Sequence, residues 1–371
     1  MTGSFEITWE EIKEEMDNIL LVDIRDLVSY QHGHIDGAIS APAGKYTEIA
    51  GRLGEYPEKT KVVLYCGMGQ AGREPVMQLR EAGVDAWNLH GGFRSWLLQG
   101  TDILAKEEIE RYSRQMLLPD VGKKGQEKLK RAKVLVIGAG GLGSPVLFYL
   151  ASAGVGTIGI ADGDSVTLSN LQRQIVHSVK SIGENKAVSA KRQLQSINPN
   201  VEIITYEYNL TPDNIEHIIC QYDFIIDGVD NFEGKFLIND ACVIHKKPFC
   251  HAGILKFQGQ VMTWVPEGGA CYRCIFEEVP KEDIPNCAQA GVIGAIAGII
   301  GSIQALEALK YIVGAGELLT GRMYILDGLT MNARIVKFGK KSEACKVCGR
   351  KHEIADIKQN RYRYMPKGCR V

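Results

Sequence analysis

The chain has 371 residues, which is enough for two or three domains. Hydrophobic residues make up 45% of it and charged residues 23%, as in ordinary globular proteins, and the formal charge is only −1. These values exclude a disordered chain, and the net charge indicates neither nucleic acid nor a membrane surface as a partner.

The N-terminal segment MTGSFEITWEEIKEEM is acidic, whereas a secretory signal is basic and then apolar. The longest uncharged apolar stretch, residues 290–303, is shorter than the roughly 18 to 20 residues of a membrane span. We therefore expect a cytoplasmic protein without a membrane segment. In a reducing compartment the ten cysteines are expected to be thiols, metal ligands or catalysts rather than disulfides.

The first hundred residues alternate short β-rich runs with helical patterns, which predicts a small α/β domain with a parallel sheet. Residues 1–105 hold 16 acidic and 9 basic side chains, whereas the remainder has an excess of basic ones, so we place a domain boundary near residue 105. The predicted strands are residues 19–23, 61–65 and 86–89, and the predicted helices are residues 9–18 and 74–82.

Strand and helix patterns alternate again over residues 106–350, which predicts a doubly wound, Rossmann-like sheet. Residues 351–371 form a basic tail of a composition typical of solvated segments. The predicted strands are residues 134–137, 157–161, 202–206, 224–228 and 248–252, and the predicted helices are residues 125–131, 186–197, 213–220, 235–245 and 292–313.

Cys66 opens a glycine-rich loop, CGMGQAGR, between a predicted strand and a helix that begins near Glu74. Backbone N–H groups of the loop and of the helix N-terminus are expected to converge on the sulfur, a setting that stabilises a thiolate. On this motif alone, a catalytic cysteine and an inert buried one are equally well supported.

Other motifs surround this loop at fixed spacings. They are DIR at residues 23–25, Tyr30, GHIDGA at residues 33–38, LHGG at residues 89–92, and Trp96. Together with Cys66 they resemble a rhodanese domain over residues 5–100, and the resemblance implies a persulfide on Cys66. One position departs from the pattern, because Ala71 stands where an arginine usually closes the loop and Arg73 comes two residues later. The guanidinium group that would bind an anionic sulfur donor is thus displaced along the loop.

A second glycine-rich motif, GAGGLG at residues 138–143, follows the predicted strand 134–137, and Asp162 ends the next strand. This is the dinucleotide fingerprint, which taken alone favours an NAD(P) or FAD enzyme, and no Walker A lysine follows it. The basic residues Arg173 and Lys186 and the acidic residue Asp230 favour a triphosphate as the ligand. A nicotinamide is neutral at its reactive end and needs no such group of charges. We assign Asp162 to the ribose hydroxyls, Arg173 and Lys186 to the phosphates, and Asp230 to Mg²⁺.

Residues 108–350 resemble the ThiF/MoeB branch of the ubiquitin-activating enzyme superfamily. The resemblance implies ATP-dependent adenylation of the C-terminal glycine of a ubiquitin-like sulfur carrier protein, by a homodimer in which Arg114 comes from the second subunit. The nucleotide-binding set is Gly138, Gly140, Gly141, Gly143, Asp162, Asn170, Arg173, Lys186, Asp230 and its neighbour Asn231.

Two CxxC pairs, Cys271 with Cys274 and Cys345 with Cys348, predict a structural zinc site of four thiolates, whereas a redox couple would need only one pair. Cys287 lies in a polar stretch before the glycine-spaced helix 292–313. The resemblance places the catalytic or resolving cysteine of the family there. The glycine spacing itself predicts close helix packing.

The combined prediction is a chain that adenylates the carrier and transfers sulfur from a Cys66 persulfide to give a C-terminal thiocarboxylate. A persulfide donor such as a cysteine desulfurase is the expected second partner. Two alternatives stay open: an NAD-dependent oxidoreductase with an appended rhodanese, and an adenylating enzyme whose rhodanese-like domain only docks an external sulfur donor. Either Cys66 attacks the adenylate first or Cys287 is acylated first, and no motif indicates the carrier or its pathway.

Overall fold

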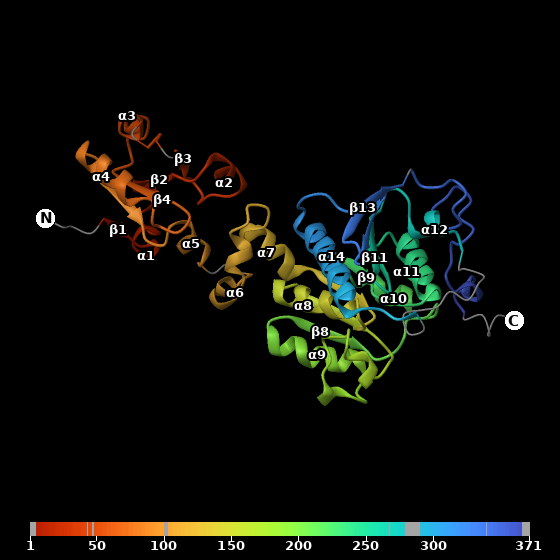
Figure 1. Ribbon diagram of the computed structural model, residues 1–371. Helices are drawn as coiled ribbons and strands as arrows, with labels where there is room; N and C mark the ends of the chain where they lie inside the picture. The colour runs from red at the N-terminus through yellow and green to blue at the C-terminus, as the bar shows by residue number, and fades with distance from the viewer. Residues whose placement is uncertain are drawn as a thin grey trace. The chain divides into compact units, whose positions relative to one another are not determined.

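The computed structural model describes residues 5–42, 44–46, 48–99, 103–266, 268–278, 290–338 and 340–365. The chain divides into two compact units, Met1–Glu127 and Lys128–Val371 (Figure 1). The predicted domain limits 1–105, 106–350 and 351–371 stay predictions.

The first unit contains a parallel sheet with the strand order β1-β5-β4-β2-β3. Its strands are β1 (Glu6–Ile7), β2 (Ile19–Asp23), β3 (Ile39–Ser40), β4 (Lys61–Tyr65) and β5 (Ala86–Leu89). Its helices are α1 (Trp9–Ile12), α2 (Leu27–His32), α3 (Glu48–Arg52), α4 (Arg73–Glu81), α5 (Gly92–Leu97) and α6 (Lys106–Met116). The predicted parallel α/β arrangement is thus confirmed, and the three predicted strands form with the predicted bounds.

Both faces of this sheet are covered, which explains why its central strands are apolar at nearly every position. Leu21 and Val63 face one core, to which α6 contributes Ile109 and Tyr112. The alternate residues Leu20 and Leu64 of the same strands face a second core, which α4 covers. The apolar face of α6 therefore completes the core of the first unit, although this helix follows the boundary predicted near residue 105.

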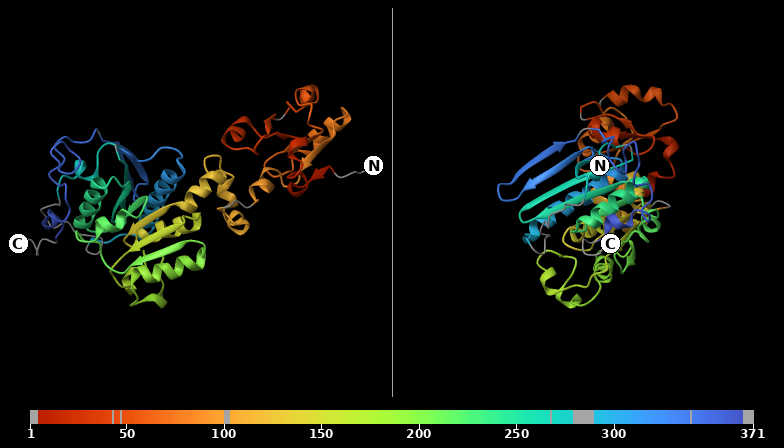
Figure 2. Two further views of the ribbon diagram at one scale, coloured as in Figure 1. Left: turned by 180° about the vertical axis from the view of Figure 1, so that it is seen from behind. Right: turned by 90° about the vertical axis from the view of Figure 1, so that its right-hand side faces the viewer.

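The second unit is built on an eight-stranded sheet with the order β13-β12-β11-β10-β9-β6-β7-β8. The parallel strands are β6 (Lys133–Ile137), β7 (Thr157–Ala161), β8 (Glu202–Tyr206), β9 (Phe224–Asp227) and β10 (Phe249–Leu255). The antiparallel strands are β11 (Gln258–Trp264), β12 (Arg322–Asp327) and β13 (Asn332–Lys337), which end one edge of the sheet (Figure 2). The parallel part has doubly wound topology, as predicted, and its direction of winding reverses between β6 and β9. Ligands bind at such a reversal.

Helices cover both faces of this sheet (Figures 1 and 2). Val134 and Val136 of β6 face one core, while Leu135 and Ile137 face the other. The first core includes α8 (Gly143–Ala153), α9 (Lys186–Ile197) and α14 (Gly294–Val313), and the second includes α10 (Ile215–Ile219), α11 (Phe232–Ile244) and α12 (Tyr272–Ile275). The helix α7 (Gly122–Arg131) precedes β6.

Among the described helices, α14 alone is long and apolar enough to cross a membrane by length and composition. Half of its most apolar window is buried, and it packs on α8, β10 and β11 in the manner of a core helix. A Cβ atom at Gly301 would lie 2.4 Å from the carbonyl oxygen of Leu142, and one at Gly294 would lie 2.4 Å from that of Gln172. The predicted use of the glycine spacing for close packing is thus confirmed for Gly294 and Gly301, whereas a Cβ atom at Gly291 or Gly298 would have no neighbour within 4 Å.

The segment 351–365 is folded onto the second unit, so the prediction of a solvated tail is wrong for this part of the chain. Ile354 and Ile357 are fully buried, and Tyr364 joins the same core. The Tyr364 hydroxyl donates to Asp240 Oδ2 over 2.8 Å. The segment is basic in composition, but Ile354, Ile357 and Tyr364 are buried and attach it to the core.

Candidate functional site

The glycine-rich loop after β6 lies against the end of β9. Gly138 has a φ of 96°, in the left-handed region, and a Cβ atom there would lie 2.9 Å from the Gly228 carbonyl oxygen. At Gly143, the first residue of α8, a Cβ atom would lie 1.9 Å from the Gly138 carbonyl oxygen. Side chains at these positions would push the loop off the strand ends, which explains the glycines of the motif.

Asp162 follows β7 directly and is 7% exposed. Its carboxylate accepts the Ala139 N–H at 2.8 Å and the Asp164 N–H at 2.9 Å, which ties the glycine-rich loop to the neighbouring strand. Burial raises the pKa of Asp162, and the nearby Lys186 ammonium opposes this effect. Each carboxylate oxygen has a second lone pair, so ribose hydroxyls have acceptors here.

Lys186 is the first residue of α9, because Asn185 caps the helix by accepting the Ala187 N–H at 2.8 Å. The Lys186 ammonium is 2.8 Å from Asp164 Oδ2, and only 9% of its side chain is exposed. Arg173 donates to the Ser169 carbonyl oxygen over 3.1 Å. Two cations are thereby held on the glycine-loop side of the fold.

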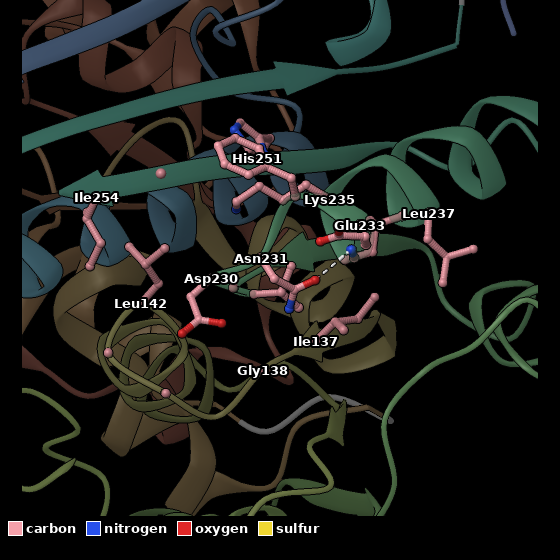
Figure 3. A pocket seen from close by; sticks show the side chains of 18 of the residues that line it. Ile137, Gly138, Leu142, Asp230, Asn231, Glu233, Lys235, Leu237, His251 and Ile254 are labelled. Carbon is pink, nitrogen blue, oxygen red and sulfur yellow. Dashed lines mark hydrogen bonds between the residues drawn. The ribbon is translucent and has the colours of Figure 1, made fainter. Parts of the chain in front are cut away.

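A cavity of about 990 Å³ opens at the reversal between β6 and β9 (Figure 3). Gly143 and Asn170 are not in its lining; Asn170 instead accepts the Thr167 N–H at 3.0 Å within its own turn. The predicted nucleotide residues that line it are Gly138, Gly140, Gly141, Asp162, Arg173, Lys186, Asp230 and Asn231. The structure thus brings most of the predicted set around one cavity.

Asp230 and Asn231 follow the end of β9, near Gly138 and Leu142 in the close-up view (Figure 3). Asn231 caps α11, and its Oδ1 accepts the Gly234 N–H at 2.8 Å, drawn as a dashed line in Figure 3. Asp230 is exposed, so its carboxylate is available to a hydrated divalent cation.

A buried network behind Asp230 was not predicted from the sequence. Asp227, at the end of β9, accepts hydrogen bonds from the Val229 N–H at 3.1 Å and from His251 Nδ1 at 2.6 Å. Lys235 lies 3.3 Å from the same carboxylate and donates to the Ala252 carbonyl oxygen. Both Lys235 and His251 line the cavity. In the sequence, a lysine and a histidine within apolar runs indicate such a network only weakly. Their common partner, Asp227, lies beside them only once β9 and β10 have paired.

Arg114 lies on α6 of the first unit and is exposed. Its assignment to the nucleotide site of a second subunit stays a prediction.

The Cys66 loop begins directly after β4, and its sulfur accepts hydrogen bonds from the Gly69 N–H at 3.1 Å and the Ala71 N–H at 3.3 Å. The predicted convergence of backbone donors on this sulfur is therefore present for the loop, while neither donor belongs to α4. The Phe93 N–H donates to the Cys66 carbonyl oxygen over 2.8 Å, so the loop rests on α5. Gly92 permits this approach, because a Cβ atom there would lie 2.3 Å from that oxygen. Cys66 itself is half-buried.

The four predicted metal ligands lie together at α12 and the C-terminal segment. The sulfur atoms of Cys271, Cys274, Cys345 and Cys348 all lie within 4.8 Å of one another, with closest pairs 3.3 to 3.8 Å apart. Four sulfurs bound at about 2.3 Å to one ion in a tetrahedron lie about 3.8 Å apart. The cluster is therefore suited to a metal ion.

Cys287 and Cys369 fall outside the described residues, so the assignment of Cys287 stays a prediction. Cys242 and Cys250 are fully buried, and burial raises the pKa of both thiols. Cys220 is exposed at the end of α10.

The fold and the two sites define a Rossmann-type nucleotide-binding unit joined to a rhodanese-type cysteine loop. The family model described as ThiF family matches residues 112–347, and the one described as rhodanese-like domain matches residues 8–99. The chain belongs to the ThiF family and carries an N-terminal rhodanese-like domain.

Similar proteins include the adenylyltransferase and sulfurtransferase MOCS3 of Aedes aegypti, which is 45% identical to this chain over 246 residues. That match covers 66% of this chain and 56% of the relative, so the chain spans little more than half the length of that protein. The sulfur carrier protein adenylyltransferase of Thermus thermophilus is 44% identical over 250 residues, covering 66% of this chain and 92% of the relative. A crystal structure of E. coli MccB with ATP has a TM-score of 0.58 and 25% identity, covering 65% of this chain and 75% of that one.

Proposed function

We propose that the chain adenylates the C-terminal glycine of a ubiquitin-like sulfur carrier protein with ATP and then converts the acyl adenylate to a thiocarboxylate. One observation carries the proposal: a single cavity at the strand reversal combines the glycine-rich loop with two cations, Arg173 and Lys186, and the exposed carboxylate of Asp230. The relatives named as adenylyltransferases support the same chemistry.

In the first step a carboxylate oxygen of the carrier attacks the α-phosphorus of ATP, and pyrophosphate leaves. The step needs positioning and charge neutralisation rather than a protein nucleophile. Asp162 holds the ribose hydroxyls, Arg173 and Lys186 neutralise phosphate oxygens, and Asp230 holds Mg²⁺. Asn170 and Asn231 belong to this set through the turns that they stabilise.

In the second step a persulfide on Cys66 attacks the carbonyl carbon of the adenylate, and AMP leaves. The N–H groups of Gly69 and Ala71 stabilise the Cys66 thiolate, which is the form that takes up the outer sulfur from the donor. Cys287 thiolate then attacks Cys66 Sγ, which releases the thiocarboxylate and leaves a Cys66–Cys287 disulfide for an external thiol to reduce. A persulfide donor such as a cysteine desulfurase reloads Cys66.

The active form in this proposal is a homodimer in which Arg114 serves the partner's cavity. Support comes from apolar side chains left exposed on two helices of the second unit, Tyr149 on α8 (55% exposed) and Leu306 on α14 (53% exposed). Large exposed apolar groups of this kind are typical of association surfaces.

The four cysteines would hold Zn²⁺, and the ion would join α12 to residues 345–348 in a structural role. This thiolate site and the free Cys66 require a reducing compartment, and we propose the cytoplasm.

The test is carrier-dependent exchange between ATP and pyrophosphate, with candidate ubiquitin-like proteins as substrates. Asp230→Ala should abolish the exchange, because the phosphate charge is left without its metal carboxylate. Glu207→Ala, which removes an exposed carboxylate outside the cavity lining, should leave it unchanged. Exchange at the normal rate in Asp230→Ala would refute the assignment.

Ala71 favours a second candidate, in which the rhodanese-like domain only docks a sulfur donor. Its N–H still contacts the Cys66 sulfur, but it brings no guanidinium to an anionic donor. In that case the adenylation is the same and the thiocarboxylate forms without Cys66.

A further inference from the structure

The cavity is wider than the nucleotide residues alone require. Beyond Asp230 it continues along the hairpin β10–β11, where Gly253, Leu255 and Gln260 line it, together with His251 and Lys235. The adenylation step described above uses neither His251 nor Lys235. Figure 3 shows both side chains beside β10, with Asp230 below them in that view.

His251 presents an unused hydrogen-bond acceptor. Its ring is 1% exposed, and its Nδ1 lies 2.6 Å from Asp227 Oδ2. Because Asp227 is a carboxylate and only accepts, Nδ1 must carry the proton and Nε2 holds a bare lone pair. Burial lowers the pKa of His251 to about 4, and the nearby Lys235 acts in the same direction, so the ring is neutral at neutral pH. Among the described residues Nε2 has no hydrogen-bond partner.

A buried acceptor without a protein partner is completed by a donor from outside the chain, either an ordered water or a group of a ligand. The phosphates and the carrier carboxylate have no N–H or O–H to donate at neutral pH. The ribose hydroxyls belong to Asp162 at the end of β7, and β10 is separated from β7 by β9 and β6. Three strand spacings amount to roughly 14 Å, so the nucleoside is on the far side of the cavity from His251. Apart from water, the donors left among the reactants are N–H groups of the carrier, and backbone N–H groups are present in a carrier of any sequence.

Lys235 strengthens this assignment. Its ammonium uses one N–H on Asp227 and one on the Ala252 carbonyl oxygen, which leaves a third. Lys235 and His251 both contact Asp227 and both line the cavity, so the pair brings one donor and one acceptor to this part of it, which complements the C=O and N–H of a peptide group.

We propose that His251 Nε2 accepts a hydrogen bond from a backbone N–H in the C-terminal segment of the carrier and thereby selects an extended peptide in the β10 half of the cavity. The inference rests on the proposed adenylation of that carrier. His251 is then a substrate-binding residue that contacts the carrier and not ATP.

The test replaces single backbone N–H groups of the substrate. A ubiquitin-like carrier that supports pyrophosphate exchange is prepared by ligation with its natural C-terminal peptide, or with one of three versions in which one of the last three amides is an ester. With wild-type enzyme, one of the esters should lower kcat/KM for the carrier by about tenfold or more, since a buried acceptor loses its donor. With His251→Phe, kcat/KM for the natural amide carrier should already be lower than with wild-type enzyme by a similar factor. The same ester should then lower kcat/KM no further.

The other esters serve as controls and should affect both enzymes equally. The KM for ATP should be unchanged in His251→Phe, and His251→Gln, which keeps an acceptor oxygen, should restore part of the sensitivity. If His251→Phe does not fold, the same ratios are measured with His251→Leu.

Two results are distinguishable. Equal effects of all three esters on wild type and variant, or a rise in the KM for ATP instead of the carrier, would overturn the role of His251 and leave the adenylation intact. If no carrier supports exchange with the wild-type enzyme, the proposed function fails, and this inference fails with it.

Discussion

The charge balance behind the cavity predicts a pH-dependent penalty for Lys235→Met. Asp227 is 1% exposed, and burial alone would raise its pKa, yet Lys235 and His251 hold the pKa below its ordinary value. Removing the ammonium leaves a buried carboxylate without its cation, which costs about 3 to 5 kcal/mol in comparable pairs. In the variant, burial then dominates and raises the pKa of Asp227.

The sign of the pH dependence follows from these two directions. The wild type gains stability from Asp227 above the ordinary pKa of the group and loses it as pH falls through the lowered one. In Lys235→Met the raised pKa reverses this, so stability is lost as pH rises. The penalty relative to wild type should therefore be larger near about pH 8 than near about pH 5, by up to about 1.4 kcal/mol per pH unit over the titration.

Hydrogen exchange of β9 and β10 peptides in the full chain, measured at both pH values, gives the local free energy of opening. The double variant Asp227→Asn with Lys235→Met should be less destabilised than Lys235→Met, because no charge stays buried. Lys180→Met, which removes an exposed lysine, should change nothing. A penalty that is the same at both pH values, or below about 1 kcal/mol, would refute the buried ion pair.

Three further results are expected. Mixing Arg114→Ala subunits with Asp230→Ala subunits should restore part of the exchange activity if the arginine serves the partner's cavity; no recovery after verified subunit exchange would place the site within one chain. Purified protein should contain one zinc per chain by elemental analysis, and Cys271→Ser should lose the metal and speed hydrogen exchange in residues 351–365; full activity without any metal would contradict this. Gly301→Ala should cost about 1 to 3 kcal/mol by overpacking against the Leu142 carbonyl oxygen and should weaken ATP binding, whereas normal affinity would show that α14 does not support the glycine-rich loop.

Regular patterns made the parallel parts of both sheets predictable. The strands of residues 19–23 and 157–161 form with the predicted bounds, because strands buried on both faces are mostly apolar. The edge strand of residues 202–206, which is only partly buried, also has the predicted bounds. The strands β11 to β13 were not predicted. β11 and β13 form hairpins with β10 and β12, whereas β11 and β12 pair although α12 and α14 lie between them in the chain. The burial of Ile354 and Ile357 was not predicted, because isolated apolar residues in a basic segment show no helix or strand periodicity.

The candidate site divides in the same way. The glycine-rich loop, Asp162 and the CxxC pairs have a spacing that their chemistry requires, so the sequence alone identifies them. The Asp227 network has no such spacing: Lys235 and His251 come from a helix and a strand, and they meet only because β9 and β10 pair in a register that places His251 opposite Asp227. A neutral histidine with a bare nitrogen becomes visible only when its partners and burial are known.

We propose that one chain both activates the carrier and supplies its sulfur through Cys66. Intact-mass analysis of the carrier, after incubation with enzyme, ATP·Mg²⁺ and a protein persulfide donor, measures both steps in one product. Wild-type enzyme should replace one carboxylate oxygen of the carrier by sulfur, whereas Cys66→Ala should still adenylate the carrier but yield no thiocarboxylate. Thiocarboxylate formed by Cys66→Ala at the wild-type rate would contradict the claim and leave the rhodanese-like domain as a docking module.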